Sequence, residues 1–90
     1  MTLAIRQSTR FRPDVKRLRR QTVDLSELES IVSALVAEEQ LDQRYQDHAL
    51  VGNWKGFREC HIQPNWLLIY RIESDELQLA RTGSHAELFG

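Results

Sequence analysis

The first twenty residues combine a short alternating stretch with an apolar stripe at helical spacing. The alternation of larger apolar side chains with other side chains over Leu3–Gln7 favours a strand. Ser8 or Thr9 can then cap a helix, because the apolar positions 11, 15 and 18 recur at intervals of four and three residues. We therefore expect a strand followed by an amphipathic helix.

A second helix is predicted in the acidic stretch that follows. Apolar side chains between positions 25 and 36 keep helical spacing, and Asp24 and Ser26 are candidate caps. Ser26 and Glu29 also fit a capping box. We expect this helix to end near Glu39.

Strand patterns dominate from Gly56 onward, after a segment over residues 40–55 that has no convincing period. Three runs favour strands, namely Gly56–Ile62, Trp66–Ile72 and Glu76–Thr82. The residues between these runs have turn chemistry. Because Trp66–Tyr70 is apolar at successive positions, the middle run is predicted to be the central strand, covered on both faces.

This order of elements predicts an α+β fold, β-α-α-β-β-β, with both helices on one face of a small, mostly antiparallel, twisted sheet. A chain of 90 residues has material for one layered core, so we expect a single domain over residues 1–90. Apolar and charged residues make up 41% and 28%, which are ordinary globular values and exclude disordered and fibrous classes.

The chain shows no signal for a membrane or for a disulfide. No apolar run approaches the roughly 18–20 residues of a spanning helix, and the N-terminus lacks the apolar core of a signal peptide. We therefore expect a cytoplasmic protein without membrane contact. Cys60 has no partner thiol, and it is expected to be a small buried hydrophobe.

The net charge of −1 is the sum of a basic segment and an acidic segment that follow each other in the chain, here called the basic pole and the acidic pole. Seven Lys and Arg side chains lie between residues 6 and 20, against the single acid Asp14. Seven acids follow between residues 24 and 47, against Arg44 alone. The basic pole can dock on a phosphate backbone, and the acidic pole then faces elsewhere or faces a basic protein partner. The alternative is that both are ordinary solvated helix faces.

Strand register brings several polar side chains to one end of the predicted sheet. If both turns are tight, His61 lies level with Leu68, and Leu68 lies level with Arg81. His61 and Arg81 then share one end and one face, with Asn65 in the first turn and His85 shortly after the last strand. A slip of one residue would move a side chain to the opposite face.

Three motifs stand out in the second half of the chain: DHALVGNWKGFRECH at 47–61, PNWLLIY at 64–70 and RTGSHAELFG at 81–90. Together they resemble the YafQ branch of the RelE-like toxins. The resemblance implies the RelE-like fold and the toxin half of a type II toxin–antitoxin pair. Such a toxin is an endoribonuclease, an mRNA interferase that enters the ribosomal A site and cuts mRNA without a metal or other cofactor. The implied partner is a small antitoxin that wraps the toxin and binds operator DNA.

Carried over by the same resemblance, the catalytic positions are His48, His61, Asn65, His85 and Phe89. The family has Asp where this chain has Asn65. Because an amide does not accept a proton near neutral pH, the family's acid/base role does not transfer to Asn65. Its amide could still orient a histidine or hold a phosphate oxygen.

Histidines suit the implied reaction. Attack of the RNA 2′-hydroxyl on the adjacent phosphate needs one proton removed and another supplied, and imidazole does both near neutral pH. We expect His61 and His85 to handle these protons, with His48 as a third participant from the long segment. Phe89 would stack on a base or position His85.

Two cations are candidate phosphate contacts, and several alternatives remain open. Arg81 could clamp the scissile phosphate or form a structural pair with an acid such as Glu59, and Lys55 could contact a phosphate. The three histidines could hold zinc, but their spacings match no metal motif, so no metal is expected. A different class of function is a weakened toxin-like module that binds antitoxin or RNA without cleavage.

Overall fold

The computed structural model describes residues 2–90 as three helices and a five-stranded mixed sheet. The elements are β1 (Ala4–Gln7), α1 (Phe11–Arg20), α2 (Ser26–Val36), β2 (His48–Ala49), β3 (Arg58–Gln63), β4 (Trp66–Glu73), β5 (Glu76–Gly83) and α3 (His85–Phe89). Two 3₁₀ turns, η1 (Gln43–Tyr45) and η2 (Gly52–Trp54), flank β2. The predicted α+β class and the order of its six main elements are confirmed.

The strand order is β1-β5-β4-β3-β2, with β1 parallel to β5 and every other pair antiparallel. β4 is therefore the central strand, as predicted, and its residues Leu67, Leu68 and Ile69 are fully buried. The mostly antiparallel sheet agrees with the sequence prediction.

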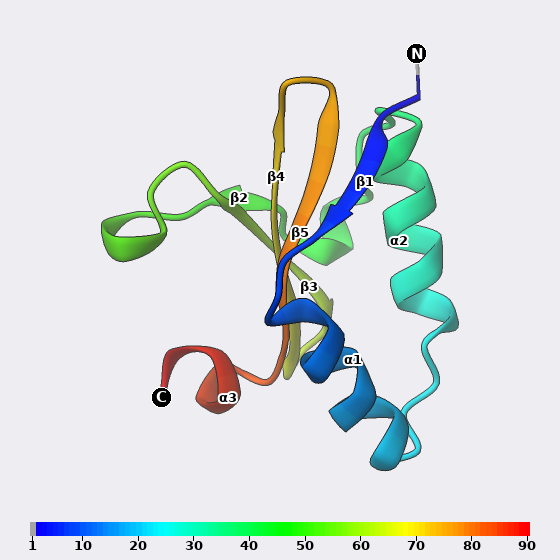
Figure 1. Ribbon diagram of the computed structural model, residues 1–90, viewed down its shortest axis with the longest axis vertical. Coiled ribbons are helices and arrows are strands. Elements are labelled where there is room, and N and C mark those ends of the chain that lie inside the picture. The colour runs from blue at the N-terminus through cyan, green and yellow to red at the C-terminus, as the bar shows by residue number, and fades with distance from the viewer. Residues whose placement is uncertain (1) are drawn as a thin grey trace.

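Two apolar layers cover the two faces of β4. Leu68 and Tyr70 pack against α1 and α2 in the larger core. Leu67 and Ile69 face the other way, toward Leu88 of α3 and the partly buried side chains Leu50, Trp54 and Phe57. In Figure 1, α1 and α2 lie on one side of the sheet, while α3 and the segment that joins β2 to β3 lie on the other. Successive side chains of a strand point to opposite faces, which explains the unbroken apolar run.

Several local predictions were wrong. The capping box lies at Ser84 and Glu87 of α3 and not at Ser26 and Glu29, because Ser26 is already helical and its N–H donates to Asp24 Oδ1 at 2.9 Å. α2 ends at Val36, before the left-handed residue at position 38. β2 and α3 were not predicted because two and five residues are too few to carry a period.

The predicted register was wrong by one residue in both hairpins. His61 pairs with Leu67, and Arg81 pairs with Ile69. Both turns are as tight as expected, but a register shift interrupts each ladder, between residues 61 and 63 of β3 and next to Tyr70 of β4. A bulge adds one residue to one strand, so spacing counted from the turn fails beyond it.

Asp14 of α1 anchors the far end of β5. Its carboxylate is 2% exposed, and it accepts hydrogen bonds from Arg81 Nε at 2.7 Å and Arg81 Nη2 at 3.0 Å. The Thr82 N–H donates to Asp14 Oδ2 at 3.2 Å, and Arg17 Nη1 donates to Asp14 Oδ1 at 3.1 Å. Burial opposes ionisation, but the hydrogen bonds from Arg81 and Thr82 outweigh it and hold the pKa of Asp14 below its usual range. The acid that binds Arg81 is thus Asp14 and not Glu59.

Cys60 is fully buried, and burial raises the pKa of its thiol to about 12. It is a neutral core side chain at physiological pH, as predicted. No helix among residues 2–90 has the length and apolar content needed to cross a membrane.

Asp14 and its partners Arg17, Arg81 and Thr82, the Asp14 cluster, should be the part of the fold whose mutation lowers the free energy of unfolding most. Asp14→Asn leaves Arg81 buried with only a neutral partner, and loss of one member of such a pair typically costs about 3–5 kcal/mol. Arg6→Gln is the control, because Arg6 is 70% exposed and lies 3.6 Å from Glu76. It should cost under about 1 kcal/mol. Urea unfolding measures the free energy of unfolding of both variants. Equal losses in the two would show that the Asp14–Arg81 pair is no more important to stability than a surface ion pair.

The lowered pKa of Asp14 gives the same cluster a pH signature. Because its folded-state pKa lies below the unfolded value of about 3.9, its contribution to stability is complete above about pH 5 and is lost as the pH falls through the folded pKa. Asp14→Asn should therefore flatten the acid limb of the stability profile. An unchanged acid limb would show that other carboxylates carry it.

Candidate active site

Pairing of β2 with β3 brings two histidines to one carboxylate. His48 lies opposite Glu59 in the ladder, and His61 follows Glu59 by two residues on the same strand face. The Nε2 atoms of both imidazoles lie 3.4 Å from Glu59 Oε1. The two ring centroids are 6.0 Å apart. Glu59 is 4% exposed, so its carboxylate is directed at the two rings and away from solvent.

A backbone carbonyl fixes the orientation of the His48 ring. His48 Nδ1 lies 2.7 Å from the Gln46 carbonyl oxygen. Because a carbonyl only accepts, Nδ1 carries the hydrogen, and Nε2 is the atom presented to Glu59. The ring is thus positioned by its own segment before any ligand arrives.

Asp47 ties the short strand β2 to the sheet. Its Oδ2 accepts a hydrogen bond from the Tyr70 hydroxyl at 2.7 Å, and its Oδ1 accepts one from Arg58 Nε at 3.1 Å. Burial and the bond to Asp47 raise the pKa of Tyr70, so its hydroxyl stays a donor. A strand of two residues has little ladder of its own, and this clamp sets the position of the adjacent His48.

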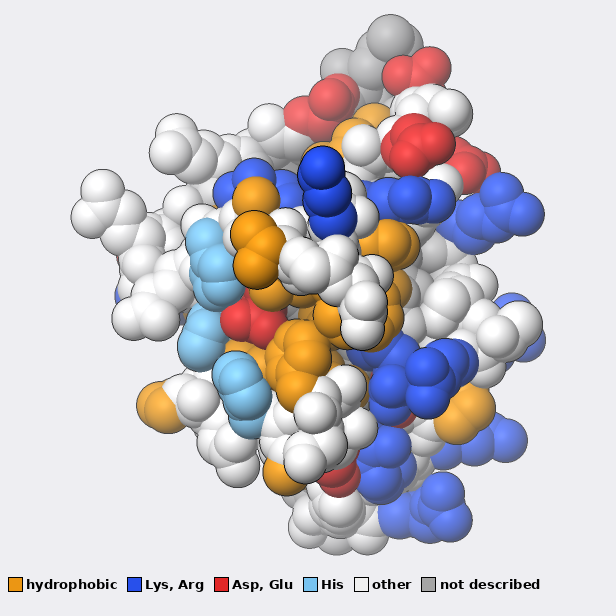
Figure 2. Space-filling model, turned by 90° about the vertical axis from the view of Figure 1, so that its left-hand side faces the viewer, with side chains coloured by type: hydrophobic (Ala, Val, Ile, Leu, Met, Phe, Trp, Pro, Cys, Tyr) orange, Lys and Arg blue, Asp and Glu red, His pale blue; other side chains and the backbone are white. Residues whose placement is uncertain are grey.

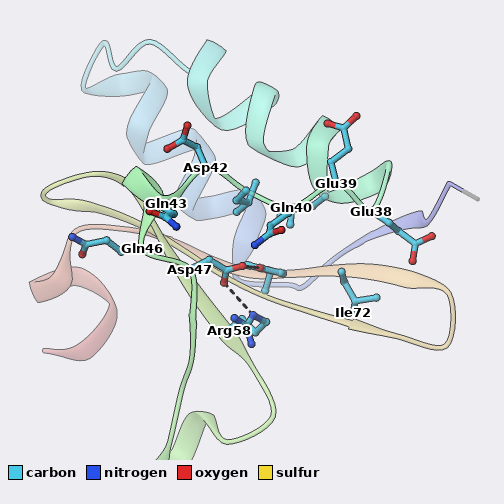
Figure 3. A pocket seen from close by; sticks show the side chains of 12 residues that line it. Glu38, Glu39, Gln40, Asp42, Gln43, Gln46, Asp47, Arg58 and Ile72 are labelled. Atoms are coloured by element: carbon cyan, nitrogen blue, oxygen red, sulfur yellow. Dashed lines mark hydrogen bonds and ion pairs between the residues drawn. The ribbon is translucent and has the colours of Figure 1, made fainter.

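Behind this clamp is a pocket of about 580 Å³ on the α2 side of the sheet. Figure 3 shows Asp47 bonded to Arg58 at its floor, with the carboxylates of Glu38, Glu39 and Asp42 along its rim. No histidine lines it. The pocket is therefore separate from the histidine cluster and is acidic.

His85 comes from a third element, α3. Its ring centroid lies 5.1 Å from that of Phe89, which is 41% exposed. The Ser84–Glu87 capping box begins the helix, and Arg17 Nε forms an ion pair with Glu87 Oε2 at 2.9 Å. Gly83 makes this approach possible, since a Cβ there would lie 2.7 Å from Arg17 Nη2. Contacts from α1 therefore set the place of His85.

The three histidines of the chain gather on one face of the molecule. Figure 2 shows their imidazoles along one side of that face, next to a carboxylate and several apolar side chains. Lys and Arg side chains lie across the same face. Three separate elements thus present groups that accept and donate protons to one surface, beside cations that suit an anionic ligand.

The remaining predicted site residues lie elsewhere or serve other contacts. Asn65 is exposed in the β3–β4 turn and lines a hollow of about 340 Å³ with Ser84 and Glu87, where no histidine is present. His61 and Arg81 pair with Leu67 and Ile69, two residues apart on one strand, so the predicted shared face is kept. The Arg81 guanidinium donates to Asp14, so Arg81 serves a structural contact. Lys55 is exposed just after η2.

Glu59 and Asp47 are the residues that sequence reasoning missed. Glu59 and His61 stand two apart in a predicted strand, which is a signal that they share a face. There was no such signal for His48, because a strand of two residues is too short to be predicted from its pattern. Together, two imidazoles and a buried carboxylate can take up a proton and stabilise the resulting charge.

The family model described as a bacterial toxin of type II toxin–antitoxin system, YafQ, matches residues 3–90. The mRNA interferase toxin YafQ of Escherichia coli K12 is 38% identical over 87 residues, which cover 96% of this chain and 95% of the relative.

Two solved structures are similar over nearly the whole chain. A copper-bound mutant toxin from Helicobacter pylori has a TM-score of 0.93 at 45% identity, covering 97% of this chain and 99% of that one. A chain of the E. coli DinJ–YafQ toxin–antitoxin complex has a TM-score of 0.92 at 36% identity, and the match covers 100% of this chain and 100% of that one.

The Asp47 clamp makes a prediction about His48. Tyr70→Phe removes one donor to a carboxylate, which should cost about 1–2 kcal/mol and loosen β2. The nuclear Overhauser contact between the His48 and His61 rings should weaken. Tyr45→Phe is the matched control, because the Tyr45 hydroxyl contacts Arg44 and not Asp47. Equal ring contacts in both variants would disprove the clamp.

Proposed function

Because this chain belongs to the YafQ family of bacterial type II toxins, we propose that it is a ribosome-dependent endoribonuclease that cuts mRNA in the ribosomal A site. Residues 1–90 act as one toxin domain in the cytoplasm. Relatives named mRNA interferase toxin YafQ support the activity, at 38% identity over 96% of the chain.

The observation that carries the proposal is the face shared by three histidines and a buried carboxylate. His48 and His61 converge on Glu59, and His85 reaches the same face from α3. RNA supplies its own nucleophile in the 2′-hydroxyl, so the protein needs only to move protons and to hold charge on the phosphate. Imidazoles meet the first need without a metal.

We assign the proton-accepting role to His61. Its Nε2 takes the 2′-hydroxyl proton as the O2′–P bond forms, and Glu59 at 3.4 Å stabilises the imidazolium. His85 donates a proton to the 5′-oxygen as the P–O5′ bond breaks. The products are a 2′,3′-cyclic phosphate and a 5′-hydroxyl. His48, when both its nitrogens are protonated, donates from Nε2 to a phosphoryl oxygen while Nδ1 stays bonded to the Gln46 carbonyl. Phe89 beside His85 stacks on a base.

Of the two candidate phosphate contacts, Lys55 is the better placed. It is exposed beside β3 and follows η2, whereas Arg81 donates through Nε and Nη2 to Asp14. Arg81 then acts indirectly, by fixing the end of β5 that leads into α3. Asn65 acts at the margin of the site, where its amide can hold a phosphate oxygen.

The partner is proposed to be a small antitoxin that wraps the toxin and binds operator DNA. The E. coli relative was solved in complex with DinJ. The acidic pocket on the α2 side of the sheet suits a cationic segment of such a partner, because Glu38, Glu39 and Asp42 line its rim. Ribosome and mRNA are the remaining partners, and no membrane is involved.

The second candidate is a weakened toxin-like module that binds antitoxin or RNA without cleavage. It is favoured by Asn65, which stands where the family has Asp. If this candidate holds, the native chain leaves mRNA intact, and Asn65→Asp restores cutting. The endoribonuclease proposal expects the native chain to cut.

Cleavage by purified protein on translating ribosomes, mapped by primer extension, tests the proposal. His85→Gln should slow cutting by about 10²–10⁴-fold, since it removes one proton transfer. Glu29→Gln on the exposed side of α2 is the control and should cut normally. The proposal fails if native protein and His85→Gln leave identical transcripts.

Metal independence has its own test. Cutting should persist when EDTA exceeds any zinc or copper present but stays below the magnesium concentration that keeps ribosomes intact, because imidazoles perform both proton transfers. The Helicobacter pylori relative was solved bound to copper, so a role of metal in this chain needs direct measurement. Loss of cutting that added zinc restores would overturn the metal-free mechanism.

A further inference from the structure

We propose that His48, Glu59 and His61 form a binding site for a zinc- or copper-type cation, and that the bound cation switches cleavage off. The inhibitory half of this proposal rests on the proposed function, and the binding half does not. The site lies at the surface where β2 joins β3.

The donor atoms are spaced for a small transition-metal ion. One ligand atom from each of the three residues lies within 4.8 Å of the others, and both Nε2–Oε1 distances are 3.4 Å. A tetrahedral zinc ion with bonds of about 2.0–2.1 Å holds neighbouring ligand atoms about 3.4 Å apart. The two distances therefore match two edges of a zinc tetrahedron.

The hydrogen-bonding pattern calls for a cation at this point. The Gln46 carbonyl fixes the hydrogen of His48 on Nδ1, so the lone pair of neutral Nε2 faces a carboxylate that also only accepts. Two facing acceptors repel each other unless a proton or a metal lies between them. A backbone carbonyl on the outer nitrogen is also the usual support of a metal-binding histidine.

Glu59 supplies the third ligand. It is 4% exposed, and its ion-pair partners among residues 2–90 are His48 and His61, each through Nε2 at 3.4 Å. A cation between the three groups would stabilise a largely buried carboxylate. His48 is half exposed, so an ion can reach the site from solvent.

The donor set selects the metal class. Two imidazoles and one carboxylate are ligands of zinc and copper, whereas magnesium and calcium prefer all-oxygen sites. Copper should bind more tightly than zinc by the general order of stability. Magnesium at the level used with ribosomes should not compete.

Binding would block the reaction because metal and substrate proton need the same atom. An ion held by His61 Nε2 occupies the lone pair that accepts the 2′-hydroxyl proton. His85 is untouched, since it belongs to α3 and lies outside the ligand set. The inhibition should be fully reversed by a chelator.

Titration of the purified full chain with zinc alone, followed by calorimetry, tests the site, and cobalt absorption reports tetrahedral geometry. We expect one ion per chain. His48→Gln and His61→Gln should each weaken binding at least about 10-fold, as loss of a ligand must exceed the 10–100-fold effects of outer-shell changes. His85→Gln is the matched control and should bind normally. Circular dichroism checks that each variant folds.

The outcomes separate the two proposals. No zinc binding, or equal binding by native protein and His61→Gln, would overturn the metal site. Zinc binding as expected with mRNA left uncut in EDTA would leave the site standing and overturn the proposed function. Cutting that continues at saturating zinc would overturn the inhibition, and cutting that stops and returns on chelation would support it.

Discussion

A strand buried on both faces needs two covering layers, and β4 imposes this constraint on the whole molecule. α1 and α2 supply one layer through the larger core. The second layer is made by α3 and the segment between β2 and β3, which contribute Leu88, Trp54 and Phe57. The elements that cover this second face also carry or adjoin the histidines. The site is therefore a consequence of how the sheet is sealed.

Two carboxylates then convert this arrangement into fixed geometry. Asp14 joins α1 to the end of β5, and Arg17 of the same helix reaches Glu87, so the body of the fold holds α3 in place. Asp47 holds β2 against the sheet in the same way, because its carboxylate accepts a hydrogen bond from the Tyr70 hydroxyl of β4. Glu59, buried between two imidazoles, is the group whose charge gives the cluster its chemistry.

Sequence patterns predicted the parts of this fold that have long periods. The two N-terminal helices and the central strand follow from apolar spacing, because burial selects for it over many residues. The register of the two hairpins was not predictable, since the β3–β4 and β4–β5 ladders each contain a shift with no mark in the sequence. The resemblance supplied the three histidines, but not Glu59, nor the pairing of Arg81 with Asp14, 67 residues away. Such contacts depend on tertiary placement and leave no spacing to read.

In the proposed reaction, this face moves two protons while the RNA 2′-hydroxyl attacks the adjacent phosphate. The most direct measurement uses a message with a single 2′-deoxynucleotide at the cleaved position, translated in the presence of purified toxin. We expect this message to stay intact, while the all-ribose message yields a 2′,3′-cyclic phosphate end. Equal cutting of both messages would rule out attack by the 2′-hydroxyl, because water would then be the nucleophile.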